Sequence, residues 1–203
     1  MKLYFAPNAC SLAPHIILRE LGLPFELVRV NNQSKRCADG RDFRSINPKG
    51  YVAALLLDNG EVLTEGPAIL QYLADLRPEA GLAPANGSWE RSRLQELLNF
   101  ISAEIHAGSA PLFNAELPEA ARVIFGDKLF KRLGYLNELL GSNDYLQGAF
   151  SIADAYLFTV LGWLLVFAID IAQWPALAGY VERVAARPAV QAAVHAEHAS
   201  APV

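Results

Sequence analysis

The sequence predicts a small N-terminal α/β domain on a mixed sheet, followed by an all-α C-terminal domain. Three observations predict this fold class. Short β-prone runs and helical runs alternate through residues 1–80. A stretch rich in turn-forming residues follows at 77–87, as is typical of a linker. Beyond Ser88 only helical runs remain. We therefore expect domains at 1–80 and 88–203.

The first domain opens with a strand, a helix and a second strand. Residues 2–5 are β-prone and end at a Pro-Asn turn signal. Residues 11–21 carry apolar side chains at helical spacing, and Gly22 ends that run. Residues 25–30 alternate as a strand does. This order predicts a β-α-β unit.

A hairpin and a helix complete the first domain. Residues 53–57 and 62–63 read as two strands, and Asp-Asn-Gly at 58–60 predicts a primed-type turn between them. The helix at 66–77 begins with Gly-Pro, and proline is well tolerated in a first helical turn.

The second domain is predicted to be wholly helical, with runs at 89–110, 119–140, 152–171, 175–186 and 189–197. Residues 155–169 carry no charge, but Asp154 and Asp170 bound them. A helix of that length spans about 22 Å, short of the ~30 Å hydrocarbon core. We therefore expect a buried helix, not a membrane span.

Composition excludes several classes of protein. The chain has 203 residues, 53% apolar and 19% charged, which is enough for a packed core and unlike a disordered chain. Its net charge of −4 gives no basic footprint for nucleic acid. Two cysteines cannot form a secreted disulfide framework, and the first residues lack a signal-peptide pattern. A cytoplasmic location is expected.

Cys10 is the first candidate catalytic residue, because it lies in a turn at the start of the first helix. The helix N-terminus favours an anion there, so the position predicts a stabilised thiolate. A small buried hydrophobe is the alternative. Cys37, in a charged stretch, is expected to be an ordinary exposed thiol, and no Cys-x-x-Cys motif is present.

Glu65 precedes a helix start whose backbone N–H groups can hold a carboxylate. Together they suit an amino-acid headgroup, with the ammonium on Glu65 and the carboxylate at Gly66. A plain helix entry with nothing bound is the alternative.

His106 lies in the 89–110 helix, three residues beyond Ala103 and seven beyond Asn99, so the three are expected to share one helix face. It could donate a hydrogen bond to a reacting sulfur or be a core histidine. The other histidines complete no metal set, and no metal site is expected. Ser151 and Asp154 form a capping box that starts a buried helix.

These residues together resemble the bacterial beta-class glutathione S-transferases, over essentially the whole chain. The matching motifs lie at residues 9–12, 47–50, 63–66, 68–69, 71–72, 99–100, 104–106, 111–113, 152–158 and 187–188.

The resemblance implies a thioredoxin-like N-terminal domain, a helical C-terminal domain and a homodimer. It implies glutathione as cosubstrate and a small hydrophobic electrophile as its partner, with no metal, nucleic acid or membrane. By the same resemblance Cys10 and His106 border the glutathione sulfur, and Phe113 and Trp163 line the cosubstrate pocket or belong to the core. The implied glutathione contacts are Ala9, Lys35, Val52, Glu65, Gly66, Asn99, Ala103, Glu104 and Ile105, with Glu104 reaching the neighbouring subunit's ligand.

Two positions depart from the family pattern. Ala53 stands where the family has a cis-proline, so the Val52–Ala53 bond is either cis or rearranged to trans, and weakened glutathione binding is expected. Ala107 stands where many relatives carry lysine, which removes a cation from the site.

The sequence favours an enzyme that conjugates the glutathione thiolate to hydrophobic electrophiles. A glutathione-dependent thiol–disulfide oxidoreductase using Cys10 and a non-catalytic binding protein for hydrophobic molecules are the alternatives. An enzyme that reductively dehalogenates a chlorinated aromatic is a narrower variant of this hypothesis.

Overall fold

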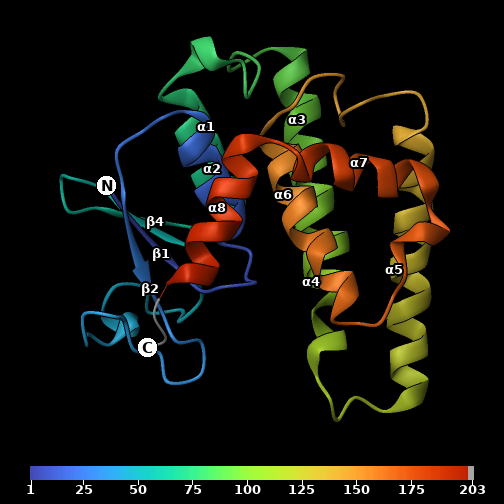
Figure 1. Cartoon of the computed structure of the whole chain (residues 1–203), viewed down its shortest axis with the longest axis horizontal. Coiled ribbons are helices and arrows are strands. Elements are labelled where there is room, and N and C mark those ends of the chain that lie inside the picture. Colours follow the sequence, from blue (N-terminus) through green and yellow to red (C-terminus); the bar gives the residue numbers. More distant parts are fainter. Residues whose placement is uncertain (201–203) are drawn as a thin grey trace. The chain divides into compact units, whose positions relative to one another are not determined.

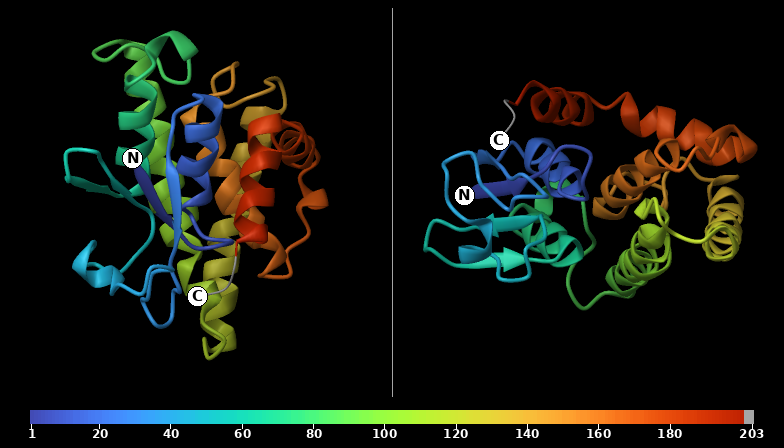
Figure 2. Two further views of the ribbon diagram at one scale, coloured as in Figure 1. Left: turned by 60° about the vertical axis from the view of Figure 1, so that its left-hand side comes forward. Right: turned by 90° about the horizontal axis from the view of Figure 1, so that it is seen from below.

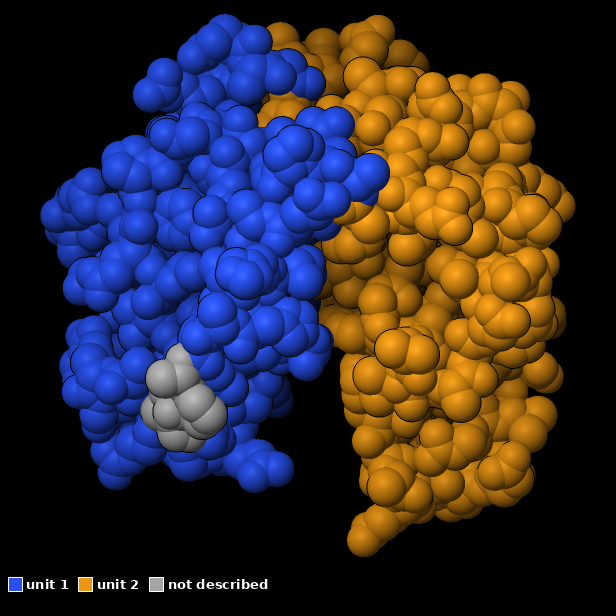
Figure 3. Space-filling model, viewed as in Figure 1, with its two compact units in different colours: residues 1–81, 186–203 blue, residues 82–185 orange. Residues whose placement is uncertain are grey.

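The computed structural model describes residues 1–200, which form two compact units (Figure 3). Unit 1 contains Met1–Gly81 and the segment from Ala186 onward, and unit 2 contains Leu82–Ala185. The fold class is confirmed, with a four-stranded sheet in unit 1 and helices throughout unit 2. The division differs from the expected 88–203, because the last helix packs within unit 1.

The sheet of unit 1 is mixed and has the order β2-β1-β3-β4. Its strands are β1 (Lys2–Phe5), β2 (Glu26–Arg29), β3 (Ala54–Leu56) and β4 (Val62–Thr64). β1 pairs in parallel with β2 and antiparallel with β3, and β3 pairs antiparallel with β4. The crossover between β1 and β2 is the predicted helix.

Three helices of unit 1 pack together, namely α1 (Leu12–Glu20), α2 (Gly66–Asp75) and α8 (Pro188–Ala199). α1 contacts both of the others, and α8 lies beside it (Figure 1 and Figure 2). Residues of β1 alternate in direction, as the strand period requires. Tyr4 joins a buried cluster with Phe43, while Phe5 contacts the His15 ring of α1.

The hairpin is formed as predicted, but its turn is of another kind. Leu57 donates to the Glu61 carbonyl over 2.8 Å, and Gly60 donates to the Leu57 carbonyl over 3.0 Å. Gly60 has a φ of 89°, whereas Asn59 does not have a positive φ. A primed type I turn requires a positive φ at both central residues. The loop is therefore a three-residue connection with glycine in the bulge position.

Cys37 is a second correction, because its side chain is 1% exposed and belongs to the buried cluster of Tyr4 and Phe43. A single β-bridge pairs Cys37 with Val30 and turns the thiol inward, although its charged neighbours are exposed. Burial raises the pKa of this thiol.

Unit 2 is helical, as predicted. Its α-helices are α3 (Trp89–Phe100), α4 (Ala107–Ser109), α5 (Glu119–Leu140), α6 (Ile152–Leu161) and α7 (Pro175–Ala185). Short 3₁₀ segments occur at Ala110–Phe113, Gly162–Leu165 and Ile171–Gln173. The capping box is confirmed, since the Asp154 carboxylate accepts from the Ser151 N–H and hydroxyl, both over 2.8 Å.

The predicted buried helix at 152–171 is too long, because α6 ends at Leu161 and Gly162 caps it. Leu165 is 87% exposed and Val166 is 66% exposed, so apolar composition did not imply burial there. Among residues 1–200, no helix combines the length and apolarity that crossing a membrane requires.

Candidate active site

Cys10 lies in the turn between β1 and α1, one residue before the N-cap Ser11. The Ser11 hydroxyl is buried and bonded to both backbone groups of Ala6, accepting from its N–H over 3.2 Å and donating to its carbonyl over 3.3 Å. Ala9 donates its N–H to the same carbonyl over 3.2 Å. These bonds fix the turn that carries Cys10, and sequence reasoning gave Ser11 no such role.

The Cys10 thiol donates to the Val52 carbonyl, with a sulfur–oxygen distance of 3.3 Å. Burial raises its pKa to about 11. Desolvation outweighs the favourable backbone contacts, so the direction of this shift is opposite to that of the expected stabilised thiolate. The Val52–Ala53 peptide bond is cis, which decides between the two alternatives left by the sequence.

A polar loop precedes Val52. The buried Asn47 side chain donates to the Tyr51 carbonyl over 2.7 Å and accepts from the Lys49 N–H over 3.2 Å. The Lys35 ammonium lies over the exposed Tyr51 ring, 5.7 Å from its centroid. Unit 1 therefore presents a cation, Lys35, beside this loop.

The corner between β4 and α2 carries Glu65, which has a φ of 71°. Its carboxylate forms an ion pair with Lys49, whose ammonium also donates to the Thr64 hydroxyl over 2.8 Å. The N–H groups of residues 68 and 69 donate to the Glu65 carbonyl, and proline at 67 has no N–H. The backbone donor at this helix start is therefore the Gly66 N–H, so there are fewer N–H donors than the sequence suggested. Lys49 is a charged neighbour that sequence reasoning missed.

A buried polar chain joins α1 to α8. Arg19 donates to His15 Nε2 over 2.9 Å, and His15 Nδ1 lies 2.9 Å from a Glu197 carboxylate oxygen. Burial lowers the pKa of His15 and raises that of Glu197. No sequence signal marked this set, because 182 positions separate its histidine from its glutamate.

In unit 2 the helix predicted at 89–110 is not regular. Residues Ile101–His106 form a π-helical segment, and Ala107 donates its N–H to Ser102, five residues back. The 3.6-residue spacing used to place Asn99, Ala103 and His106 on one face does not hold across this segment.

The residues of this segment differ in exposure. Asn99, Ala103 and Glu104 are exposed, whereas the Ile105 side chain is 2% exposed, so only its backbone could meet a ligand. The Glu104 carboxylate is already bonded to Arg132 Nε over 2.8 Å.

His106 lies in an aromatic cluster. Its Nδ1 is 2.7 Å from the Tyr156 hydroxyl, and its ring packs edge to face against Trp163 at 4.8 Å. Trp163 is 6% exposed and packs on Phe113, which is 48% exposed and also meets Phe167 at 4.7 Å. Trp163 is therefore mainly a core residue, and Phe113 is accessible to a ligand.

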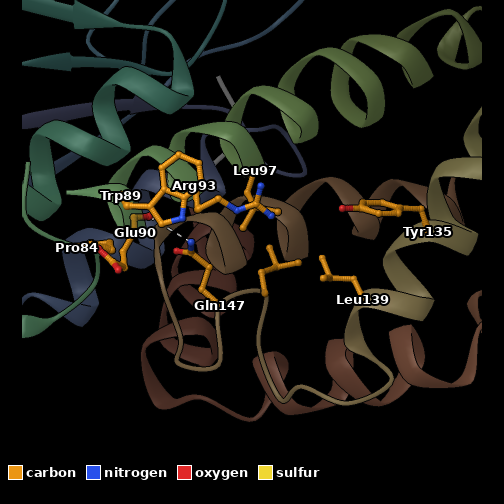
Figure 4. A pocket seen from close by; sticks show the side chains of 9 residues that line it. Pro84, Trp89, Glu90, Arg93, Leu97, Tyr135, Leu139 and Gln147 are labelled. Carbon is orange, nitrogen blue, oxygen red and sulfur yellow. Dashed lines mark hydrogen bonds between the residues drawn. The ribbon is translucent and has the colours of Figure 1, made fainter. Parts of the chain in front are cut away.

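A separate pocket of about 360 Å³ lies between α3 and α5 (Figure 4). It contains none of the predicted site residues; its lining is Pro84, Trp89, Glu90, Arg93, Leu97, Tyr135, Leu139, Leu146 and Gln147. Within residues 1–200 no group of three His, Cys, Asp or Glu side chains could hold a metal ion. His195 and His198 are both exposed on α8.

Comparison with known proteins supports the same family in both parts of the chain. The N-terminal domain model of glutathione S-transferases matches residues 9–76, and the C-terminal domain model matches residues 100–188. Glutathione S-transferase GstA of Escherichia coli O157:H7 is 46% identical over 198 residues, covering 97% of this chain and 98% of that protein.

Solved structures agree. A sphingomonad glutathione S-transferase complexed with glutathione is 46% identical, with a TM-score of 0.95 over 98% of this chain and 100% of that one. The beta-class enzyme of Sphingomonas chungbukensis is 44% identical, with a TM-score of 0.93 over 97% and 98% of the two chains. This chain belongs to the glutathione S-transferases, and within them to the bacterial beta class.

Proposed function

We propose that this protein conjugates the thiol of glutathione to small hydrophobic electrophiles. The observation that carries the proposal is the corner at Glu65, where a carboxylate and the Gly66 N–H at a helix start stand on adjacent residues. An amino-acid headgroup carries an ammonium that a carboxylate can bind and a carboxylate that a backbone N–H can bind. The γ-glutamyl end of glutathione has both charges.

The Lys49 ammonium modifies how this corner would work. It pairs with Glu65 in the absence of ligand, so the ligand's ammonium must share that carboxylate or displace Lys49. A displaced Lys49 would be available to the glutamyl carboxylate. The charge balance of the corner is then the same with and without ligand.

The remainder of the tripeptide is assigned to unit 1 by the family resemblance. We propose that the Val52 backbone pairs with the cysteinyl unit, beside the Cys10 thiol that already contacts its carbonyl. Ala9 would border the same position. Lys35, whose ammonium lies over the Tyr51 ring, is proposed to bind the glycine carboxylate.

The state of Cys10 favours conjugation over disulfide exchange. With a pKa of about 11, only about one thiol in 10⁴ is ionised at pH 7. Disulfide exchange requires the thiolate of the attacking cysteine. The glutathione sulfur is therefore proposed as the nucleophile, and Cys10 as a protonated neighbour that can donate to it.

In unit 2 we propose that His106 is the second catalytic residue, as a hydrogen-bond donor to the glutathione thiolate. Phe113 is proposed to contact the electrophile, with Trp163 supporting it from the core. The proposed glutathione contacts from this unit are Asn99, Ala103, Glu104 and Ile105, the last through its backbone. Glu104 would have to leave Arg132 to meet a second subunit's ligand.

A homodimer and a cytoplasmic location complete the proposal. Trp89 is 72% exposed and Tyr135 is 48% exposed on the α3–α5 face, and a second copy is the occupant we propose for it. Both cysteines are free thiols, which fits a reducing compartment. Light scattering during size exclusion tests the dimer, and a Trp89→Glu variant that stays folded but dimeric would argue against this face.

The central experiment compares the wild type with Cys10→Ala. Initial rates of glutathione conjugation to an activated aryl halide are measured alongside calorimetric titration with glutathione. We expect turnover well above the uncatalysed rate, with Cys10→Ala retaining activity at a reduced level. Saturable glutathione binding without turnover in the folded wild type would reject the conjugation reaction. Disulfide exchange that is abolished by Cys10→Ala would then favour the oxidoreductase.

A further inference from the structure

We propose that Arg122 on α5 is a positioning residue for Phe113. Its guanidinium donates to the backbone carbonyls on both sides of Phe113 and so fixes the place where this half-exposed ring would meet a ligand. The inference deepens the proposed function, in which Phe113 contacts the electrophile, and rests on that function. Arg122 itself is expected to touch neither the electrophile nor glutathione.

The two hydrogen bonds of Arg122 have a fixed direction. Its Nη1 donates to the Leu112 carbonyl over 3.2 Å, and its Nη2 donates to the Asn114 carbonyl over 2.8 Å. A guanidinium has only donors and a carbonyl has only acceptors. The Leu117 N–H also donates to the Asn114 carbonyl, over 3.2 Å, which the two lone pairs of that oxygen allow. The guanidinium therefore holds the backbone at the two residues that flank Phe113.

The segment that carries Phe113 needs such support because it is short. Ala110–Phe113 forms a single 3₁₀ turn, and helical segments of this length are marginal on their own. Asn114 then leaves the turn with an extended backbone. The last carbonyls of a helical segment have no partner within it. Arg122 supplies a charged donor to one of them, at Leu112, and a second donor to the first carbonyl beyond the turn.

The helix that carries Arg122 is anchored in the core of unit 2. The Arg122 N–H donates to the Pro118 carbonyl over 2.9 Å, which places Arg122 at the beginning of α5. Further along the same helix, Leu129, Leu133 and Leu136 are buried. A cation near a helix N-terminus is unfavourable for the helix dipole. The two carbonyl contacts are therefore the interactions that favour arginine at this position.

The Phe113 ring is packed on one part of its surface only. It meets Trp163 edge to face at 5.3 Å and 74°, and Phe167 at 4.7 Å and 68°. The residue is still 48% exposed, so ring packing alone leaves it room to move. A side chain that already occupies its binding position loses less conformational freedom when a ligand binds. Arg122 should therefore strengthen the binding of an apolar electrophile without contacting it.

Hydrogen exchange followed by mass spectrometry tests the two contacts directly, in the full unliganded chain. In Arg122→Met the amides of residues 110–117 should exchange about tenfold faster than in the wild type, because two charge-assisted hydrogen bonds are lost. Arg122→Lys keeps the charge and a donor, and it should restore part of the protection. Unchanged exchange in Arg122→Met would overturn the proposal.

Steady-state kinetics tests whether this support serves the reaction. Arg122→Met should raise the KM for a neutral aryl halide about threefold, as loss of the Phe113 ring would, with kcat and the KM for glutathione changed by less than about twofold. In a Phe113→Ala background the same substitution should cause no further rise. An equal rise in both backgrounds would mean that Arg122 acts without Phe113, and it would overturn the proposal.

An anionic electrophile separates positioning from direct binding. Arg122→Met is assayed with a chloronitrobenzoate and with its methyl ester. A residue that acts through Phe113 should change the two KM values by the same factor. A cation in contact with the substrate would matter more for the carboxylate. A larger loss for the carboxylate would therefore make Arg122 a binding residue and overturn the proposal.

Arg183→Met is the matched control. It removes another guanidinium of unit 2, one that lies on α7 and donates to the Asp144 carbonyl over 2.8 Å. It should change neither the exchange of residues 110–117 nor the KM for the aryl halide. If both arginine variants raise that KM equally, the effect is one of general stability and the proposal fails. A wild type without turnover would reject the proposed function alone, since hydrogen exchange requires no reaction.

Discussion

The candidate functional residues of the two units lie in different surroundings. Unit 1 presents charges and backbone groups, with the Lys49–Glu65 pair exposed and Lys35 lying over an aromatic ring. Unit 2 presents an imidazole held by Tyr156 and Trp163. Exposed charges bind a charged tripeptide with little preorganisation, whereas a ring fixed by buried neighbours is preorganised for one geometry.

From this difference we expect glutathione affinity and kcat to depend on different units. Substitutions among the charged groups of unit 1 should act mainly on glutathione affinity. Substitutions in the aromatic cluster of unit 2 should act mainly on kcat. Cys10 is the exception in unit 1, since it is a potential reactive group that burial keeps protonated.

Raising the pH should therefore have the largest effect of all, on the reactivity of Cys10. Burial raises the pKa of its thiol to about 11, so the thiolate fraction should grow tenfold with each pH unit below that value. Between pH 7 and 10 the alkylation rate should rise about 10³-fold. The rate is measured with iodoacetamide in a Cys37→Ser variant, which leaves Cys10 as the one thiol. A plateau near neutral pH would show a preformed thiolate and favour disulfide exchange.

Removing the Glu65 charge should give the next largest effect. Glu65→Gln keeps the size and hydrogen-bonding capacity of the side chain but loses the charge that attracts the glutamyl ammonium. We expect the Kd for glutathione to rise about 30-fold with kcat nearly unchanged, the size expected for one charge-assisted hydrogen bond. Isothermal titration measures the Kd.

Glu61→Gln is the control for that substitution, because Glu61 is exposed in the hairpin loop and bonds only locally, to Asn59. It should leave the Kd unchanged. An unaltered Kd in Glu65→Gln would show that Glu65 does not bind the γ-glutamyl end of glutathione.

Replacing His106 should lower kcat and leave the Kd for glutathione nearly unchanged, the opposite of the result expected for Glu65. His106→Phe keeps an aromatic ring against Trp163 but removes the N–H donor, so we expect kcat to fall about tenfold while the Kd for glutathione stays within about twofold. Stopped-flow turnover and titration on one preparation separate the two. A large rise in Kd with constant kcat would mean that His106 contributes to glutathione binding. The two units would then not differ in their effects on affinity and kcat.

Local sequence signals predicted the parts of the fold that depend on neighbouring residues. The helix start at Gly66 and the capping box at Ser151 both follow from short patterns and were confirmed. Each involves hydrogen bonds or steric preferences that span a few positions. Such features survive in almost any tertiary context.

The signals failed where distant residues decide the outcome. Cys37 lies in a charged stretch yet is buried, because its β-bridge to Val30 turns it inward. The His15–Glu197 contact joins residues from opposite ends of the chain. The π-helical turn before His106 changes a period that the sequence pattern does not display.

The sequence predicted which residues are functional candidates, but not their pKa shifts or their interaction partners. Helix-start chemistry, residue type and the family resemblance together selected Cys10, Glu65 and His106. The raised pKa of Cys10, the Lys49 partner of Glu65 and the Tyr156 partner of His106 depend on burial and three-dimensional contact. These states decide which chemistry is favoured, and only the folded chain reveals them.

The smallest effect is expected at Phe113, where the aromatic cluster reaches the surface. Phe113→Ala should raise the KM for an apolar aryl halide about threefold, since the ring is half exposed and a ligand would bury only part of it. The KM for glutathione should not change, because no charged group is removed. Steady-state kinetics with each substrate varied in turn measures both constants.

Phe130→Ala provides the matched control, because Phe130 is 39% exposed on α5 and packs against Trp174 instead of the His106 cluster. Its loss should leave the KM for the aryl halide unchanged. If both variants raise that KM equally, the aromatic cluster does not define the electrophile site. If Phe113→Ala instead changes kcat alone, the cluster acts by supporting His106 through Trp163, and the electrophile is bound by other residues.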